Sequence, residues 1–290
     1  MASLELIRRV SFLGPAGTNS DLAAQSVFPG ASGLPCKSFE EAISAVLEGE
    51  ADRALIPIEN SIAGRVADVH HLMPKSGLHI VGEHFERISH NLLVVPGTKL
   101  SDIKRVHSHA QALGQCRNFI RSHSFEAATE NDTAGAAKLV AERGDKSSAA
   151  IASTRAADLY GLEILKADIE DEHNNTTRFL VLSRVAEVPD VDEGDCITTF
   201  VFRVRSTPAA LYKAMGGFAT NGINLTKLES YMVGGTFVAA QFYADAEGHP
   251  DQRPMRLALE ELRFFSREVK VLGVYPANPF RQSGIMNQAD

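Results

Sequence analysis

Four loops of this sequence carry small polar side chains beside predicted strands, where a solvated loop would usually carry charges. Hydroxyl, amide and guanidinium groups of this kind can bind a small carboxylate and hold it in one orientation. If the neighbouring strands are parallel, the loops gather at the carboxyl ends of the strands, where α/β proteins bind their ligands. The four loops comprise residues 14–20, 57–61, 107–111 and 174–179.

The first two loops each allow a structural and a functional interpretation. Residues 14–20 lead into a helix expected to begin near Asp21, and free backbone N–H groups at a helix start can bind an anion. The glycine spacing fits neither a dinucleotide-binding fingerprint nor a P-loop, so a tight turn with Ser20 as the helix N-cap is equally compatible. In the second loop, Asn60 or Ser61 is expected to cap a helix over residues 62–72, and residue types alone favour this capping over a ligand contact.

The third and fourth loops carry the remaining candidates. Gln111 and Gln115 are one helical turn apart and therefore share one face of a helix. A metal site at the two histidines of the third loop is not expected, because no third ligand follows at a metal-site spacing. In the fourth loop Thr177 precedes Arg178, whose planar guanidinium suits binding of a carboxylate through two hydrogen bonds. Residue types alone are equally compatible with a surface ion pair at Arg178 and with Thr177 as a strand-favouring residue.

Short apolar runs alternate with helical patterns up to an acidic, proline-containing segment at residues 187–195. This alternation predicts an α/β domain with a largely parallel sheet, which would bring the loops together. After the acidic segment, the order of strand, helix, two strands joined at Gly234-Gly235, helix and strand predicts a ferredoxin-like βαββαβ domain of roughly 80 residues. Strands are expected over residues 10–13, 54–58, 92–95, 149–151 and 179–182 and around Val106, then over residues 197–204, 223–233, 237–243 and 269–275, with helices over residues 208–220 and 253–266.

The composition limits the class of protein. The 290 residues, 44% hydrophobic and 22% charged, are ordinary for a globular protein of about two domains. A net charge of −7 gives no long-range attraction for nucleic acid or for an anionic membrane, so neither is expected as a partner. Three widely spaced cysteines offer no disulfide framework, which indicates a reducing compartment. Charges near the N-terminus break any signal-peptide core, and no apolar run reaches the ~20 residues of a membrane span, so we expect a cytoplasmic protein.

Five motifs follow one another along the first part, namely Gly14-Pro15-x-Gly17-Thr18, Pro57-Ile58-Glu59-Asn60-Ser61, Ser108-His109-x-Gln111, Asp132-Thr133-Ala134 and Asn175-x-Thr177-Arg178-Phe179. Taken together and in this order, they resemble the prephenate dehydratase family. The second part resembles the regulatory ACT domain that follows the catalytic domain in this family, at Leu211-Tyr212 and along residues 222–230. Five ordered motifs and the appended domain together make a chance match implausible.

The resemblance implies a bilobed catalytic domain over residues 6–186, similar to periplasmic binding proteins, with the substrate in the central cleft. A linker would cover residues 187–195, the ACT domain residues 196–277 and a tail residues 278–290. The resemblance also implies the reaction, in which prephenate loses carbon dioxide and hydroxide to give phenylpyruvate, the keto-acid precursor of phenylalanine. Because formation of the aromatic ring drives this elimination, no cofactor and no metal are expected, only orientation, carboxylate anchoring and help for the departing hydroxide.

The resemblance also assigns roles to individual residues. Thr177 lies closest to the leaving hydroxyl and acts as an orienting hydrogen-bond donor, with Arg178 and Phe179 as its catalytic neighbours. Arg178 and backbone amides near Thr18 are expected to hold a carboxylate. The expected substrate-binding residues are Thr18, Glu59, Asn60, Ser61, Ser108, Gln111, Thr133 and Asn175.

The ACT resemblance implies feedback regulation by L-phenylalanine, bound where ACT domains pair in a homodimer or homotetramer. In many relatives an arginine and a proline follow the Glu-Ser pair of the second strand, whereas this chain has Tyr231-Met232. The affinity and the sign of the regulation are therefore left open. The expected effector-binding residues are Ala209, Ala210, Leu211, Asn224, Leu225, Glu229 and Ser230.

Two other functions remain as alternatives. An arogenate dehydratase performs the same elimination on the transaminated substrate, whose amine would need an acid in the cleft such as Glu59. A non-catalytic sensor of small carboxylates or amino acids would also use a bilobed cleft and an ACT domain, but it would not need the Thr-Arg-Phe segment. A fusion with chorismate mutase is not expected, because the N-terminus leaves no room for that helical module.

Overall fold

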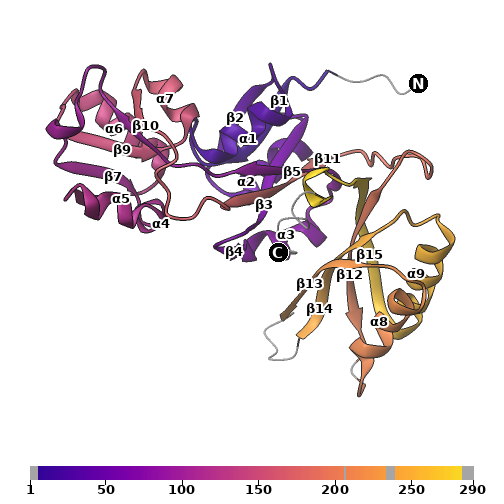
Figure 1. Cartoon of the computed structure of the whole chain (residues 1–290). Coiled ribbons are helices and arrows are strands. Elements are labelled where there is room, and N and C mark those ends of the chain that lie inside the picture. The colour runs from indigo at the N-terminus through magenta and orange to yellow at the C-terminus, as the bar shows by residue number, and fades with distance from the viewer. Residues whose placement is uncertain (1–5, 206, 233–238, 283–290) are drawn as a thin grey trace. The chain divides into compact units, whose positions relative to one another are not determined.

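The computed structural model describes residues 6–205, 207–232 and 239–282. The chain forms two compact units, each built from two stretches of sequence (Figure 1). The first unit comprises Met1–Val66 and Phe85–Phe179, and the second comprises Ala67–His84 and Leu180–Asp290. Within the described part of the chain, no helix has the length and apolar character needed to cross a membrane.

The first lobe of the first unit is an α/β layer whose strands lie in the order β2-β1-β3-β11. β1 pairs in parallel with both β2 and β3. Phe12, Leu55 and Ile56 are fully buried, as expected for strands that are covered on both faces. The elements are β1 (Arg9–Leu13), α1 (Asn19–Val27), β2 (Ser32–Cys36), α2 (Phe39–Leu47), β3 (Arg53–Asn60), β4 (Gly64–Arg65) and β11 (Thr176–Ser183).

The second lobe of the first unit is a five-stranded sheet of order β10-β6-β9-β7-β8 with helices on both faces. Successive side chains of a strand point to opposite faces, so Leu92 packs with α4 and α5 whereas Leu93 packs with α6 and α7. The chain then returns to the first lobe as β11, and the predicted bilobed α/β architecture is confirmed. The elements are β6 (Asn91–Val94), η2 (Leu100–Asp102), β7 (Arg105–His109), α4 (Ala110–Gln115), α5 (Arg117–Ser122), β8 (Glu126–Glu130), α6 (Thr133–Arg143), β9 (Ser148–Ala152), α7 (Thr154–Tyr160) and β10 (Glu163–Lys166).

The second unit contains the predicted βαββαβ order, which is confirmed. Its antiparallel sheet has the order β13-β14-β12-β15, and β5 pairs in parallel with β15. The chain between the two stretches of the first unit adds a short helical segment before β5. The elements are α3 (Ala67–Leu72), η1 (Met73–Lys75), β5 (His79–Arg87), β12 (Cys196–Val204), α8 (Ala210–Thr220), β13 (Leu225–Met232), β14 (Ala239–Glu247), α9 (Arg253–Phe265) and β15 (Ser266–Pro276).

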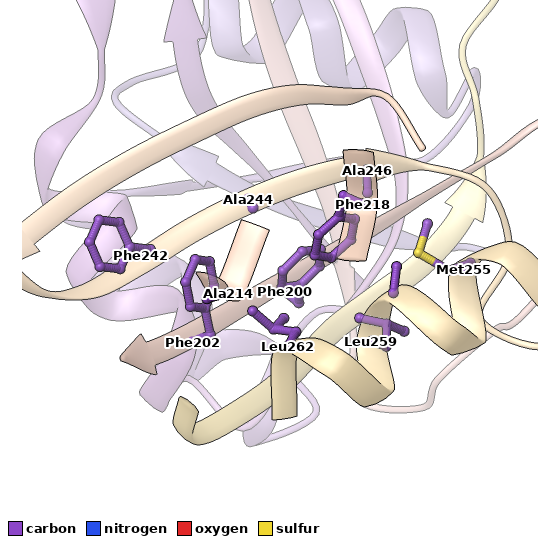
Figure 2. Packing of buried hydrophobic residues seen from close by; sticks show 11 residues of the cluster. Phe200, Phe202, Ala214, Phe218, Phe242, Ala244, Ala246, Met255, Leu259 and Leu262 are labelled. Atoms are coloured by element: carbon purple, nitrogen blue, oxygen red, sulfur yellow. The ribbon is translucent and has the colours of Figure 1, made fainter. Parts of the chain in front are cut away.

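The core of the second unit lies between this sheet and the two helices α8 and α9 (Figure 2). Phe200 of β12 stacks on Phe218 of α8, with ring centroids 5.6 Å apart. A Cβ atom on Gly217 would lie 3.2 Å from Ala258 Cα, so the close approach of α8 to α9 requires glycine at this position. Small residues and stacked aromatic rings together set the separation between the helices and the sheet.

The helix predicted over residues 62–72 is wrong in its first half. The chain instead turns after Asn60 and forms the two-residue strand β4, and α3 begins only at Ala67. Gly64 has φ +81°, a left-handed conformation that favours glycine and ends the turn. The predicted turn at Gly234-Gly235 and residues 283–290 of the predicted tail lie outside the described residues, and the predicted domain boundaries stay predictions.

Candidate active site

A cavity of about 430 Å³ lies in the first unit, where the polar loops identified from the sequence meet. Seven predicted site residues line it, namely Thr18, Asn60, Gln111, Thr133, Asn175, Thr177 and Phe179. The strand ends of β1 and β3 and the starts of α1, α4 and α6 supply most of the wall. The lining also includes Leu13, Gly14, Pro15, Asn19, Ser20, Pro57, Ala63, Gly64, Arg65, Val66, Ile88, His90, His109, Ala112, Gln115, Asn131 and Asp132.

Asn60, the last residue of β3, has an orientation that backbone groups fix. Its Oδ1 accepts hydrogen bonds from the backbone N–H groups of Ile62 at 3.0 Å and Ala63 at 2.8 Å. Because backbone N–H groups can only donate, the other end of the carboxamide must be the Nδ2 donor. This Nδ2 donates to Thr177 Oγ1 at 2.9 Å and to Asn175 Oδ1 at 2.7 Å.

Thr177 lies at the start of β11 and lines the cavity. Since its oxygen already accepts from Asn60, its own hydroxyl proton is available to donate to a ligand. An oxygen that accepts a hydrogen bond also becomes a better donor through its own proton. Asn60 thus orients the Thr177 hydroxyl as a hydrogen-bond donor at the cavity wall, and we call this group the directed hydroxyl.

Two long helices begin at the cavity. Thr18 caps α1 by accepting from Asp21 N, and Asp132 caps α6 by accepting from Gly135 N at 2.7 Å. The positive end of the α1 dipole therefore faces the cavity and favours an anionic ligand, whereas the Asp132 carboxylate offsets the dipole of α6. The predicted N-cap Ser20 is wrong, because α1 begins at Asn19.

The loop before α1 is held by the second lobe. Gly17 N donates to the buried Asp21 Oδ2 at 2.9 Å, and the same carboxylate oxygen accepts from Arg155 Nε at 3.0 Å. Ser153 Oγ donates to Gly17 O at 2.7 Å. These bonds fix the glycine loop across the two lobes of the first unit, so the start of α1 has a defined position in the cavity.

Four predicted site residues do not line the cavity. Arg178 is buried and donates to Glu59 Oε1 at 2.9 Å, because on a strand its side chain points away from the face used by Thr177 and Phe179.

The other two residues outside the cavity lining are serines whose hydroxyls bond to the backbone. Ser108 Oγ is fully buried and donates to Ile151 O at 2.6 Å. Ser61 Oγ donates to Asn174 O and accepts from Thr176 N, which ties the end of β3 to the start of β11. The substrate contacts predicted for these four residues receive no support from this geometry.

The cavity also contains side chains that were not among the predicted site residues. Arg65, His90 and Gln115 line it, as does the exposed His109, whose Nδ1 accepts from Gln111 N at 3.3 Å. His90 and Arg65 stand outside the loop patterns that directed the sequence interpretation. Among the described residues, no three His, Cys, Asp or Glu side chains are grouped so that they could hold a metal ion.

The predicted effector-binding residues lie in the second unit, at the start of α8 and on or just before β13. Ala209 has φ +59° and precedes α8, while Ala210 is buried. A separate cavity of about 300 Å³ in this unit is lined in part by Tyr231 and Met232, but by none of the predicted effector residues. The buried Tyr231 hydroxyl accepts from Gln241 Nε2 at 3.0 Å, and burial raises the pKa of Tyr231 to about 12.

Comparisons with known proteins identify one family of similar sequences. The sequence pattern of the prephenate dehydratase family covers residues 10–187. A bifunctional N-acyl-homoserine lactone acylase/prephenate dehydratase of Komagataeibacter europaeus is 50% identical over 95% of this chain and 98% of its own length. Arogenate dehydratase/prephenate dehydratase 1 of Arabidopsis thaliana is 39% identical over 94% of this chain and 73% of its own length.

Solved structures give the same result. GqqA, described as a novel type of quorum quenching acylase, has a TM-score of 0.89 at 50% identity and covers 94% of this chain and 100% of that chain. Prephenate dehydratase of Arthrobacter aurescens in complex with L-Phe has a TM-score of 0.82 at 31% identity and covers 97% of this chain and 98% of its own. With the family pattern spanning both lobes and relatives matched along nearly the whole sequence, this chain belongs to the prephenate dehydratase family.

Proposed function

We propose that this protein catalyses the decarboxylating dehydration of prephenate to phenylpyruvate. The observation that carries the proposal is the directed hydroxyl of Thr177, held by Asn60 at the wall of a cavity between two lobes. Family membership supports a dehydratase, and the arrangement of donors supports this reaction.

The reaction needs little from the protein beyond orientation and a donor. The bond from the ring to its carboxylate breaks and leaves its electron pair in the ring as carbon dioxide departs. The bond from the ring to the hydroxyl breaks with the electron pair leaving on oxygen, and one proton converts the departing hydroxide to water. A threonine hydroxyl is a very weak acid, so Thr177 acts as a hydrogen-bond donor to the leaving oxygen and the proton comes ultimately from solvent.

The two carboxylates of prephenate have suitable partners in the cavity. The start of α1 presents backbone N–H groups and a positive dipole end, and Arg65 adds a cation, while the Asp132 carboxylate offsets the dipole of α6. We propose these groups as the partners of the substrate carboxylates, and the carboxylate-binding role expected for Arg178 stays a prediction. Phe179 supplies an apolar surface beside Thr177 that suits the ring of the substrate.

The direct test is turnover by the purified protein at neutral pH. Phenylpyruvate is followed by its ultraviolet absorbance in alkali, with arogenate run in parallel and its product phenylalanine separated by chromatography. Formation of phenylpyruvate well above the blank without enzyme supports the proposal, whereas no turnover of either substrate would overturn it. Such a result would favour the non-catalytic sensor.

Arogenate is the first alternative substrate, since the Arabidopsis relative carries both dehydratase names. Its ammonium group would need an acid, but Glu59 accepts from Arg178 and does not line the cavity. Asp132 lines the cavity but already caps α6. A capping carboxylate keeps its charge, so Asp132 can still pair with the ammonium group of arogenate, and the parallel assay on the two substrates decides between them.

A second candidate function is hydrolysis of N-acyl-homoserine lactones, favoured by the name of the 50% identical relative from Komagataeibacter. Such an amide hydrolysis would need a nucleophile or an activated water beside a base, and the cavity holds hydroxyls together with His90 and His109. Mass spectrometry of released homoserine lactone tests this function independently of the dehydratase assay. Loss of both activities in a single Thr177→Val variant would place them in one cavity.

We also propose that L-phenylalanine regulates the enzyme through the ferredoxin-like part of the second unit, in a homodimer or homotetramer. The Arthrobacter relative, whose structure contains L-Phe, supports this proposal. Tyr231 and Met232 stand where the resemblance to the family leads us to expect arginine and proline, so the affinity for L-phenylalanine has to be measured on this chain. Titration calorimetry with L-phenylalanine that shows no binding heat would overturn it.

A further inference from the structure

A chain of hydrogen bonds extends from Asn60 along the cavity wall to His90. Asn60 Nδ2 donates to Asn175 Oδ1 at 2.7 Å, and Asn175 Nδ2 donates to Gln115 Oε1 at 3.2 Å. Gln115 Oε1 also lies 2.7 Å from His90 Nε2. All four side chains line the cavity.

The direction of every bond in this chain follows from the backbone. The N–H groups of Ile62 and Ala63 fix Asn60 Oδ1 as an acceptor, so Asn60 Nδ2 is the donor. Asn175 must then accept through Oδ1 and donate through Nδ2, which makes Gln115 Oε1 an acceptor. His90 therefore carries a proton on Nε2 and donates it to Gln115, whichever charge the ring holds.

The direction of these hydrogen bonds determines which end of the Gln115 carboxamide can bind a ligand. Because Oε1 accepts from both His90 and Asn175, the NH2 group is the end left to donate to a ligand. Without the donor on His90, only the longer 3.2 Å bond from Asn175 Nδ2 would hold Gln115 Oε1 in place. A carboxamide flip would then cost one hydrogen bond instead of two, and the flipped state would present an oxygen to an anionic substrate. An amide oxygen of Gln115 that faces a substrate carboxylate would repel it, because both groups are hydrogen-bond acceptors.

His90 itself is held firmly. The residue is 3% exposed and lies between β5 and β6. Its backbone N–H donates at 2.9 Å to Glu170 Oε2, whose side chain is buried. Its Nδ1 is buried and has no hydrogen-bond partner among the described residues. A histidine fixed through its backbone and one ring nitrogen is suited to orient a neighbour.

We propose that His90 is a positioning residue for the dehydration, which holds the Gln115 carboxamide with its NH2 group toward the substrate. This inference rests on the proposed function. His90 acts through Gln115, so its effect depends on the residue at position 115. The orientation of Gln115 sets the affinity for the anionic substrate and for the transition state.

Three variants separate this role from a merely structural one. His90→Leu removes the donor, whereas His90→Gln keeps a nitrogen donor near the place of Nε2. Gln115→Glu replaces the NH2 group by oxygen and so imposes the acceptor that a flipped carboxamide would present. His107 provides a matched control, because it is also 3% exposed, bonds Glu130 through Nδ1 and does not line the cavity.

The experiment measures kcat and KM for prephenate with the purified full-length variants. His90→Leu is expected to lower kcat/KM about tenfold, the cost of one misdirected hydrogen bond, while His90→Gln stays within about threefold of wild type. His107→Leu is expected to stay within about threefold of wild type. Gln115→Glu should lose more than Gln115→Met. Thermal unfolding of each variant shows that the compared proteins are folded.

A double-mutant cycle gives the decisive readout. In a Gln115→Met background, adding His90→Leu should change kcat/KM by less than about twofold, because the group that His90 orients is gone. A further tenfold loss in that background would overturn the proposal, as would wild-type activity in His90→Leu or equal losses in His90→Leu and His90→Gln. If the wild type turns over neither prephenate nor arogenate, the proposed function fails first, and the inference fails with it. If the wild type turns over prephenate normally but the losses in kcat/KM of His90→Leu and Gln115→Met add up in the double variant, the inference is overturned and the proposed function stands.

Discussion

The guanidinium of Arg178 donates to Glu59 Oε1 at 2.9 Å, from a side chain that is only 3% exposed. The two residues lie on the neighbouring strands β11 and β3, and the ring of Phe85 lies 5.9 Å from Arg178 Cζ. Thr177 and Phe179, on either side of Arg178, line the cavity. The ion pair thus joins the strand that carries the reactive hydroxyl to the strand that ends at Asn60, and supports the site from outside the cavity.

The Arg178→Met variant should unfold more easily. The substitution removes a buried guanidinium and leaves the partly exposed Glu59 carboxylate without this partner, which costs about 1–3 kcal/mol of unfolding free energy. Urea denaturation followed by circular dichroism measures the change. Gln111→Met serves as the control for stability, because Gln111 is exposed at the cavity. Unchanged stability together with a tenfold higher KM for prephenate would instead show that Arg178 binds the substrate carboxylate.

The Thr177→Val variant should lose catalysis and keep binding. Removal of one preorganised donor to a developing negative charge costs about 100-fold or more in kcat, whereas KM should change by less than about threefold. Thr177→Ser, which keeps the hydroxyl, should retain more activity than Thr177→Val. Steady-state kinetics on prephenate provide both constants.

Thr129→Val is the matched control for Thr177, since Thr129 is an exposed strand threonine that does not line the cavity. It should keep the wild-type kcat. A Thr177→Val enzyme within a few-fold of wild type would remove the directed hydroxyl from the mechanism.

Much of the fold follows from local patterns. The strands found from the sequence are those with continuous apolar runs, such as residues 54–58 in β3. β2 was not predicted, since its sequence contains Gly33 and Pro35, which both disfavour strands locally. β2 forms because β1 pairs with it over five residues, a contact between distant segments.

The residues of the candidate site also fall into two groups, those that a local sequence pattern predicts and those whose place depends on distant parts of the chain. Thr177 and Asn60 were predicted because they stand in recognisable loops, and both line the cavity. The outward direction of Arg178 could have been inferred, because alternate residues of a strand face opposite sides. His90 could not have been found from a local pattern, since its place depends on Gln115, 25 residues further along the chain.

The Arg281→Ala variant should destabilise the second unit. Arg281 donates to both oxygens of Glu83, at 2.6 and 2.7 Å, and the Glu83 side chain is fully buried. Loss of the guanidinium leaves a buried carboxylate short of its bidentate partner, which costs about 3 kcal/mol. Hydrogen exchange of the β5 and β14 amides reports the change locally.

Gln282→Ala is the control for Arg281, because among the described residues the Gln282 side chain donates one exposed hydrogen bond, of 3.4 Å, to Asp195. The hydrogen-exchange rates of the β5 and β14 amides in Gln282→Ala should match those of the wild type. Equal protection of β5 in Arg281→Ala and wild type would contradict the stabilising role of the pair.

The stability of the second unit should fall in alkali because of Tyr231. Burial raises its pKa to about 12, above the ordinary value of about 10, so the folded state holds the phenolic proton more tightly than the unfolded state. The resulting stabilisation is complete below pH 10 and is lost as the pH rises from 10 to about 12. Tyr231→Phe should therefore show a shallower loss of unfolding free energy between pH 9 and 11.5 in denaturant titrations. Tyr212→Phe, at a position 81% exposed, should keep the wild-type slope. Equal slopes in wild type and Tyr231→Phe would show that the alkaline loss comes from other groups.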